Sequence, residues 1–312
     1  MKRDAICLPA AHAGEPSPST TSEWVNPGLA LRGWLAFRRL PPSIMICWVL
    51  LVAFTLTAVF APWMTPQDPD ATQIMAKLNP PFFLEGYDGT HLLGTDQLGR
   101  DLLSRCVYGV RVSVGIALLG LVVGCLIGTT LGIMSGLIGG LVDRVIMMLV
   151  DVFITVPFLL LVLVGIAAFG TDTLVLVALI GLARWESYAR IVRGQVLQVR
   201  EMPFVEASRA LGADTLWIAV RHVLPNIASP LLVLLTLNFP SILLLESSLS
   251  FLGIGVQPPT ASLGRMVGDG RDHLIFAWWV AVAPAMVIVA ITFVVQMLGD
   301  WLRDVLDVRI DD

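Results

Sequence analysis

Long apolar segments alternate with short polar ones along most of the chain. Five of these segments are almost free of charge, and they cover residues 44–61, 112–134, 145–170, 227–245 and 274–298. Roughly 20 consecutive apolar residues are enough to cross the hydrocarbon layer of a bilayer as an α-helix. The pattern therefore predicts five spanning helices, of which the third has Asp151 near its start and Pro157 inside it.

A sixth, weaker span is predicted from the distribution of basic residues. Residues 173–183 are apolar, but Arg184, Trp185 and Glu186 follow directly. Short cytoplasmic loops of membrane proteins carry an excess of Lys and Arg. With six spans and the N-terminus inside, 14 of the 20 basic residues are cytoplasmic, whereas without this span 8 lie inside and 12 outside. We therefore expect an all-α polytopic membrane protein with six transmembrane helices and both termini in the cytoplasm.

Composition excludes an ordinary soluble domain. Of the 312 residues, 56% are hydrophobic and only 14% are charged, whereas about a quarter are charged in a typical soluble protein. The net charge of −4 argues against a nucleic-acid partner. The first apolar segment begins too far along the chain to be a cleavable signal peptide. We expect a multi-pass protein of a bacterial plasma membrane, in contact with membrane lipid.

The polar segments divide the chain further. The predicted parts are a disordered, basic cytoplasmic arm (1–43), a first transmembrane helix (44–61), an extracytoplasmic loop (62–108), a core of five transmembrane helices (109–298) and a cytoplasmic tail (299–312). The core contains a cytoplasmic loop at 190–226. Loops of this size between spans tend to carry contacts rather than merely connect.

The chain has no motif of a catalytic or metal centre. Its four cysteines form no CxxC pair, and its four histidines lack the spacing of metal ligands. Neither a GxxxxGK[ST] phosphate loop nor a GxSxG motif is present. We therefore expect a protein that is not an enzyme and that binds no metal or cofactor itself.

Glycine recurs at every fourth position of the second apolar segment, at Gly120, Gly124, Gly128, Gly132 and Gly136. A step of four residues advances an α-helix by about 400°, so these glycines form a slowly winding stripe. Small residues let neighbouring membrane helices approach closely. The stripe favours tight helix packing over direct contact with a substrate.

Charged residues just before this segment predict a surface helix. Arg100, Leu102, Leu103 and Cys106 follow an amphipathic pattern, as expected for a helix along the outer membrane surface with snorkelling arginines. The favoured role of this surface helix is to fix the start of the 112–134 span, and the alternative is contact with a substrate.

The segment EMPFVEASRALGADTLWIAVRHVLPN, residues 201–226, predicts a helix–turn–helix on the cytoplasmic side. Pro203 suits the first turn of a helix. Gly212 can adopt the left-handed conformation that ends a helix and reverses the chain. Asp214 or Thr215 can then cap a second helix.

The first of these two helices carries an apolar face of Phe204, Ala207 and Leu211, and Pro225 is expected to close the unit. Two readings remain open from the residues alone. The unit is either a connector on the membrane surface or a docking element for a partner, and two capped helices are more structure than a connector needs.

The pattern EAS-x3-G with LP at 224–225 resembles the "EAA" loop of the permease subunits of bacterial ABC importers. In that family the short helix sits in a cleft of a cytoplasmic ATPase and passes nucleotide-driven movement to the spans. Ser208 replaces the second alanine of the motif, and His222 stands where many members have an aliphatic residue. The resemblance implies that the coupling residues are Glu206, Ala207, Ser208, Arg209, Leu211 and Gly212.

Three further segments, 91–118, 246–271 and 298–309, are similar to the C-type subunit of dipeptide/oligopeptide importers. This resemblance implies the type I permease fold and the translocation of peptides. It also implies four kinds of partner or ligand elsewhere: a homologous permease subunit in a heterodimer, two ATPase subunits, the ATP bound to them, and an extracytoplasmic peptide-binding protein. The alternative cargoes are nickel complexes, glutathione or another small solute.

Two acidic residues near the ends of spans are singled out, because an ionisable group at membrane depth is a functional candidate by default. Glu246 either pairs with an arginine or faces the translocation path, where it would meet a peptide amino group. Asp151 is expected to pair with Arg144.

Two other classes of protein fit less well. A membrane-embedded enzyme would need polar groups clustered at one depth, whereas Asp151, Glu186 and Glu246 lie at different ends of the spans. A scaffold without transport would leave the glycine stripe and the helix–turn–helix unexplained.

Overall fold

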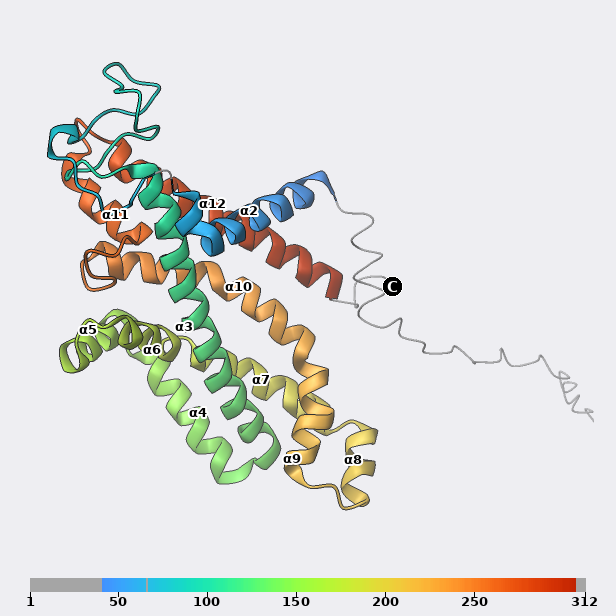
Figure 1. The fold of residues 1–312 in the computed structure, drawn as a ribbon. Helices are drawn as coiled ribbons and strands as arrows, with labels where there is room; N and C mark the ends of the chain where they lie inside the picture. The colour runs from blue at the N-terminus through green and yellow to red at the C-terminus, as the bar shows by residue number, and fades with distance from the viewer. Residues whose placement is uncertain (1–40, 66, 307–312) are drawn as a thin grey trace, which may run out of the picture. The chain divides into compact units, whose positions relative to one another are not determined.

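The computed structural model describes residues 41–65 and 67–306, which lie within one unit, Leu40–Asp312. Over these residues the chain folds into helices and a single isolated β-bridge. The α-helices are α2 (Pro42–Met64), α3 (Leu102–Ile138), α4 (Gly140–Thr155), α5 (Phe158–Phe169), α6 (Thr173–Leu182), α7 (Trp185–Arg200), α8 (Pro203–Ala210), α9 (Thr215–Ile218), α10 (Leu224–Phe251), α11 (Leu263–Gly270) and α12 (Trp279–Leu306) (Figure 1).

Helix boundaries differ from the predicted segments at several points. The first predicted span, 44–61, lies within α2, and the loop that follows ends at residue 101 rather than 108 because α3 begins at Leu102. Most of the predicted tail 299–312 is a direct continuation of α12 as far as Leu306. Residues 1–40 of the predicted N-terminal arm lie outside the described residues.

The number of long spans differs from the prediction of six. Among the described residues, four helices are long and apolar enough to cross a membrane, or five if the bent pair α4–α5 counts as one. The predicted fourth span is two helices instead, because α6 has only 10 residues and the more polar α7 begins at Trp185. A helix of 10 residues is only about 15 Å long, half the thickness of the hydrocarbon layer.

The predicted third span is broken as well. Helices α4 and α5 meet at a bend of 94° around Val156 and Pro157. Proline lacks the N–H that a helix interior needs and drives the residue before it out of the helical conformation. Val156 is accordingly extended, with ψ at 124°. Pro157 therefore starts a new helix instead of lying within one.

Helix α3 packs along α6 and α7 through the glycine stripe, as predicted. A methyl group added at Gly124 would lie 2.8 Å from the carbonyl oxygen of Gly181, and one added at Gly128 would lie 2.3 Å from that of Trp185. Gly181 belongs to α6 and Trp185 to α7, so the stripe changes partner across the break between them. One unbroken helix thus supports both halves of a broken span.

Ionic contacts tie one end of α3 to α4 and α7. The Arg193 guanidinium donates to Asp143 (Nη2 to Oδ2, 2.7 Å), and Ser135 donates to the same carboxylate. Arg200 donates to the carbonyl oxygen of Gly136 at 3.0 Å. The expected pairing of Asp151 with Arg144 is wrong, because Asp151 accepts from Arg190 at 2.7 Å.

The other end of α3 is held by the loop lobe, which we define as residues 67–101. The Asp101 side chain caps α3 by accepting from the Ser104 N–H at 2.8 Å, which confirms the structural role of this segment. The predicted surface helix is wrong, because these residues belong to the loop and to the first turns of α3. Arg100 and Arg105 are buried rather than snorkelling.

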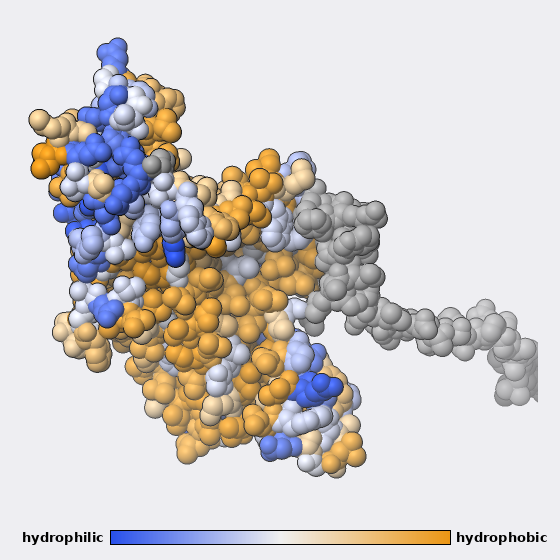
Figure 2. Space-filling view, viewed as in Figure 1, coloured by the Kyte–Doolittle hydropathy of each residue, from blue (hydrophilic) through white to orange (hydrophobic). Residues whose placement is uncertain are grey.

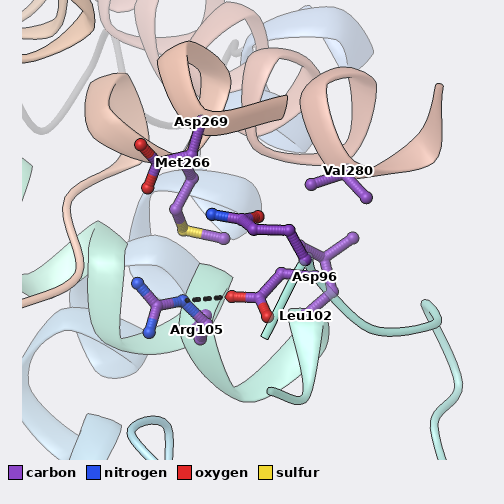
Figure 3. A pocket seen from close by; sticks show the side chains of 7 residues that line it. Asp96, Leu102, Arg105, Met266, Asp269 and Val280 are labelled. Atoms are coloured by element: carbon purple, nitrogen blue, oxygen red, sulfur yellow. Dashed lines mark ion pairs between the residues drawn. The ribbon is translucent and has the colours of Figure 1, made fainter. Parts of the chain in front are cut away.

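Figure 3 shows where Arg105 points. Its Nε lies 3.5 Å from Asp96 Oδ2, beside a cavity of about 10 Å³ that Met266 and Val280 also line. The space suits about one water molecule. Arg100 donates to the same carboxylate at 2.6 Å, and Arg105 also pairs with Asp70 at 3.4 Å, so Asp96 and Asp70 together compensate two buried cations.

The loop lobe also depends on Asp88. Burial raises the pKa of the Asp88 carboxyl, but hydrogen bonds from Thr90, Asn79 and His91 outweigh this effect and hold the pKa below its ordinary value. His91 in turn contacts the capping residue Asp101 at 3.2 Å. The loop is thereby fastened to the start of α3.

Polar surface gathers at two ends of the described residues. On the face in Figure 2, hydrophilic residues gather on the loop lobe and α11 at one end, and they are mixed with hydrophobic residues over α8 and α9 at the other. Hydrophobic residues cover the helices between them. An apolar surface of this extent is unusual on a water-exposed protein and is expected where lipid covers the helices.

We predict that Gly128→Ala lowers the free energy of unfolding in detergent by about 1–3 kcal/mol, the usual cost of overpacking. The added methyl group would collide with backbone atoms of α7, which cannot move aside as a flexible side chain could. Gly115→Ala in the same helix is the matched control, because no heavy atom lies within 4 Å of the added methyl group there. Equal stability of the two variants would contradict the packing argument.

Candidate functional site

The candidate site is the helical hairpin, which we define as α8, the turn at Gly212 and α9. Helix α8 starts at Pro203, as predicted. It ends with two backbone bonds: Gly212 N–H donates to Arg209 O at 2.9 Å, and Ala213 N–H donates to Ser208 O at 3.0 Å. This pair of bonds is the Schellman motif. Gly212 has the predicted left-handed conformation, with φ at 86°.

The second half of the hairpin does not end where the sequence suggested. Asp214 occupies the N-cap position of α9, although its side chain makes no capping bond. Pro225 was expected to close the unit, but it lies at the start of α10, directly after a π-helical segment, and the helix continues past it. Through a π-helical segment, Ala219–Val223, one helix of 37 residues runs from Thr215 to Phe251. The hairpin is therefore continuous with a spanning helix.

Val205 anchors the hairpin, a role that the sequence did not reveal. Its side chain is 0% exposed and packs into a cluster with Val196, Ile218 and Val223. The apolar face predicted on α8 is not buried in this way, and Leu211 is 90% exposed. Sequence pattern alone could not separate one buried apolar position from several exposed ones on a helix of eight residues.

A hydrogen bond joins α8 to the π-helical segment that follows α9. Ser208 Oγ lies 2.9 Å from His222 Nε2. The His222 ring also contacts Phe204 and Trp217, with ring centroids 5.3 and 5.1 Å away. The two positions at which the motif departs from its family pattern, Ser208 and His222, are thus bonded to each other.

The tip of the hairpin offers a shallow, mixed surface. A cavity of about 360 Å³ is lined by Ser208, Leu211, Gly212, Ala213, Asp214 and Trp217. Glu206, Ala207 and Arg209 are exposed on α8. The predicted coupling residues therefore lie together on one accessible unit, with both charged and apolar groups available to a partner.

Glu246 has a different environment from the one expected. Its side chain is 0% exposed, and it accepts from Ser250 at 2.8 Å and from Ser247 at 3.4 Å. The expected pairing with an arginine is wrong, because serine hydroxyls bind this carboxyl group. Its place in a translocation path stays a prediction. Within the described residues, no group of three or more His, Cys, Asp or Glu side chains is placed to hold a metal ion.

Comparison with known families identifies the chain. A family model described as the inner membrane component of binding-protein-dependent transport systems matches residues 128–312. The chain belongs to this family. A second family model, described as the N-terminal TM domain of oligopeptide transport permease C, matches residues 32–81 of the permease. The protein is thus a multi-pass permease of the inner membrane.

Curated relatives cover most of the permease. The di/tripeptide transport system permease protein of Pseudomonas aeruginosa is 37% identical, over 94% of this chain and 97% of the relative. A putative peptide transport system permease protein of Brucella suis is 40% identical, over 86% and 88%. The glutathione transport system permease protein of Shigella flexneri is 36% identical, over 89% of each chain.

A solved structure shares the fold of the permease. The methionine ABC transporter MetNI in an inward-facing conformation matches with a TM-score of 0.51 and 20% identity, over 65% of this chain and 97% of that chain. The predicted all-α type I ABC importer permease fold is confirmed, whereas the predicted count of six spans is not matched by the four or five long spans of the structure.

We predict that Val205→Ala loosens the hairpin. Removing two buried methyl groups costs about 1.6 kcal/mol, which corresponds to hydrogen exchange more than tenfold faster at the α8 amides. Leu211→Ala is the matched control, because this leucine is almost fully exposed. Exchange of α8 that is as fast in the control as in Val205→Ala would show that the buried valine does not hold the hairpin.

Proposed function

We propose that this permease is the membrane subunit through which an ATP-driven importer moves di- and oligopeptides into the cell. One observation carries the proposal: the exposed hairpin is continuous with the spanning helix that ends at Phe251. A partner that moves the hairpin therefore acts on a spanning helix through a continuous helical backbone.

In this mechanism a cytoplasmic ATPase binds the hairpin through Glu206, Ala207, Ser208, Arg209, Leu211 and Gly212. The ATPase subunits, two per importer, bind and hydrolyse the ATP, and this chain contributes no catalytic group or cofactor. Their movement tilts the 37-residue helix, which is about 55 Å long. The permease then opens alternately to the two sides of the membrane.

The proposal fixes the orientation and the remaining partners. Five arginines, from Arg190 to Arg221, lie on α7, on α8 and directly after α9, and an excess of basic residues favours the cytoplasmic side. The loop lobe then faces outward, toward an extracytoplasmic binding protein, and both termini are cytoplasmic. A homologous permease subunit completes the translocation path as a heterodimer.

Peptides are the favoured cargo because the relatives from Pseudomonas aeruginosa and Brucella suis are named for peptide transport. The relative named for glutathione transport keeps glutathione as the specific alternative. Glutathione is itself a small peptide with an unusual linkage, so both cargoes would present charged amino and carboxylate groups to the permease.

We predict that Gly212→Val lowers peptide uptake and ATPase binding at least about tenfold, while the amount of permease in the membrane stays unchanged. At Gly212 a side chain would meet no atom within 4 Å, so the effect comes from the left-handed backbone alone. A β-branched residue strongly disfavours that conformation. Uptake of radiolabelled dipeptide and co-purification of the ATPase provide the measurements.

The matched control is Gly194→Val in α7, which also meets no atom within 4 Å but has an ordinary helical backbone. Gly212→Asn is a second control, because asparagine tolerates the left-handed region. Unaltered uptake by Gly212→Val would show that the hairpin does not couple to an ATPase.

We predict that a strain lacking this permease, and requiring an amino acid for growth, fails to grow when di- or tripeptides are its only source of that amino acid. Restoring the gene should restore growth, and growth on the free amino acid is the control. Normal growth of the deletion strain on every peptide would favour glutathione, a nickel complex or another small solute as cargo.

A further inference from the structure

The two broken spans meet at one cavity. Val156 and Pro157, at the break between α4 and α5, line a cavity of about 400 Å³ together with Ala183 and Arg184, at the break between α6 and α7. Discontinuous helices that meet in the interior of a membrane protein expose backbone groups and helix ends to a ligand.

This cavity lies at membrane depth. Helix α10 contributes Ser241 to it, from the spanning part of the 37-residue helix. Helix α6 is only about 15 Å long and ends at Leu182, so a span that starts with α6 at one surface of the hydrocarbon layer would break about halfway across it. The position is where an importer would hold its cargo between the two sides of the membrane.

Glu186 is the most unusual group in this cavity. It is only 9% exposed, and its Oε2 atom has no hydrogen-bond partner among the described residues. A buried carboxylate oxygen without a partner is costly, and folding alone gives no reason to keep it.

Arg184 precedes α7 and lines the same cavity. Among the described residues, neither Arg184 nor Glu186 forms an ion pair. Arg190, further along α7, is bound to Asp151 instead. One anionic and one cationic side chain therefore face a space whose other walls include the apolar side chains of Phe153 and Phe158.

We infer that this cavity is a cargo-binding site for the two charged ends of a short peptide. The Glu186 carboxylate binds the α-ammonium group, the Arg184 guanidinium binds the α-carboxylate, and the aromatic walls accept the side chains. Each contact would be a charge-assisted hydrogen bond. A volume of about 400 Å³ lies in the range of small-molecule sites. The inference rests on the proposed function and assigns residues to its cargo.

The test compares two peptides in the complete importer, with its binding protein, reconstituted in vesicles. The probes are alanylalanine and lactylalanine, in which a hydroxyl group replaces the amino group. Glu186→Gln should lower alanylalanine uptake about tenfold or more, the usual worth of a charged hydrogen bond, and change lactylalanine uptake less than twofold. The binding protein delivers both peptides to the unaltered importer and to the Glu186→Gln importer. Its own preference between the two peptides therefore does not affect the comparison.

Arg184→Gln provides the second arm, with alanylalanine and its C-terminal amide as probes. It should lower uptake of the free acid about tenfold or more and change uptake of the amide less than twofold. Asp304→Asn, at an exposed position near the end of α12, is the charge-matched control and should alter no uptake rate. Basal ATP hydrolysis and the amount of assembled importer should be the same in all variants.

Two results would overturn the site. An equal loss of both peptides in a variant would assign the residue a structural role, and no loss of either would place the cargo elsewhere. The proposed function fails in a different way: the importer with the unaltered permease would then carry neither alanylalanine nor lactylalanine. A failed site leaves uptake by the unaltered permease intact, so the two outcomes are distinguishable.

Discussion

The backbone contact between α3 and the broken pair α6–α7 is the constraint on which the rest of the structure depends. Irregular backbone is tolerated at membrane depth only where protein covers it. Because Gly124 and Gly128 carry no side chain, α3 lies directly against both sides of the break. The unbroken helix keeps the two halves aligned, and the interrupted segment can then present Arg184 and Glu186 to a cavity instead of to lipid.

Two helices connect the hairpin with that cavity. Helix α7 begins beside the cavity and ends at Arg200, just before α8, where Arg200 also binds the end of α3. The helix from Thr215 to Phe251 starts in the hairpin and brings Ser241 to the cavity wall. In the proposed function, movement of the hairpin therefore reaches the cargo site from two sides: along the helix from Thr215 to Phe251, and along α7 across the short link at Glu201 and Met202.

Local features of the fold were predictable, and long-range ones were not. The turn at Gly212 needs only the residues beside it, and the glycine stripe is visible as a simple period, so the sequence predicts both. The break before Arg184 depends on support from α3. Because α3 is distant in sequence, a hydropathy window over residues 173–200 carries no information about this support. Pro225 continues a helix that it was expected to end, because a π-helical segment joins it to α9. The serine partners of Glu246 could not be read from the pattern of apolar segments.

The hairpin owes its shape to main-chain hydrogen bonds at Gly212 and to the buried side chains of Val205 and Ile218. Most of its outward-facing side chains take no part in holding that shape. Natural variation can therefore alter these side chains without cost to folding. Importers of one family can then keep the same architecture, while each permease recognises its own ATPase and not the ATPases of related importers.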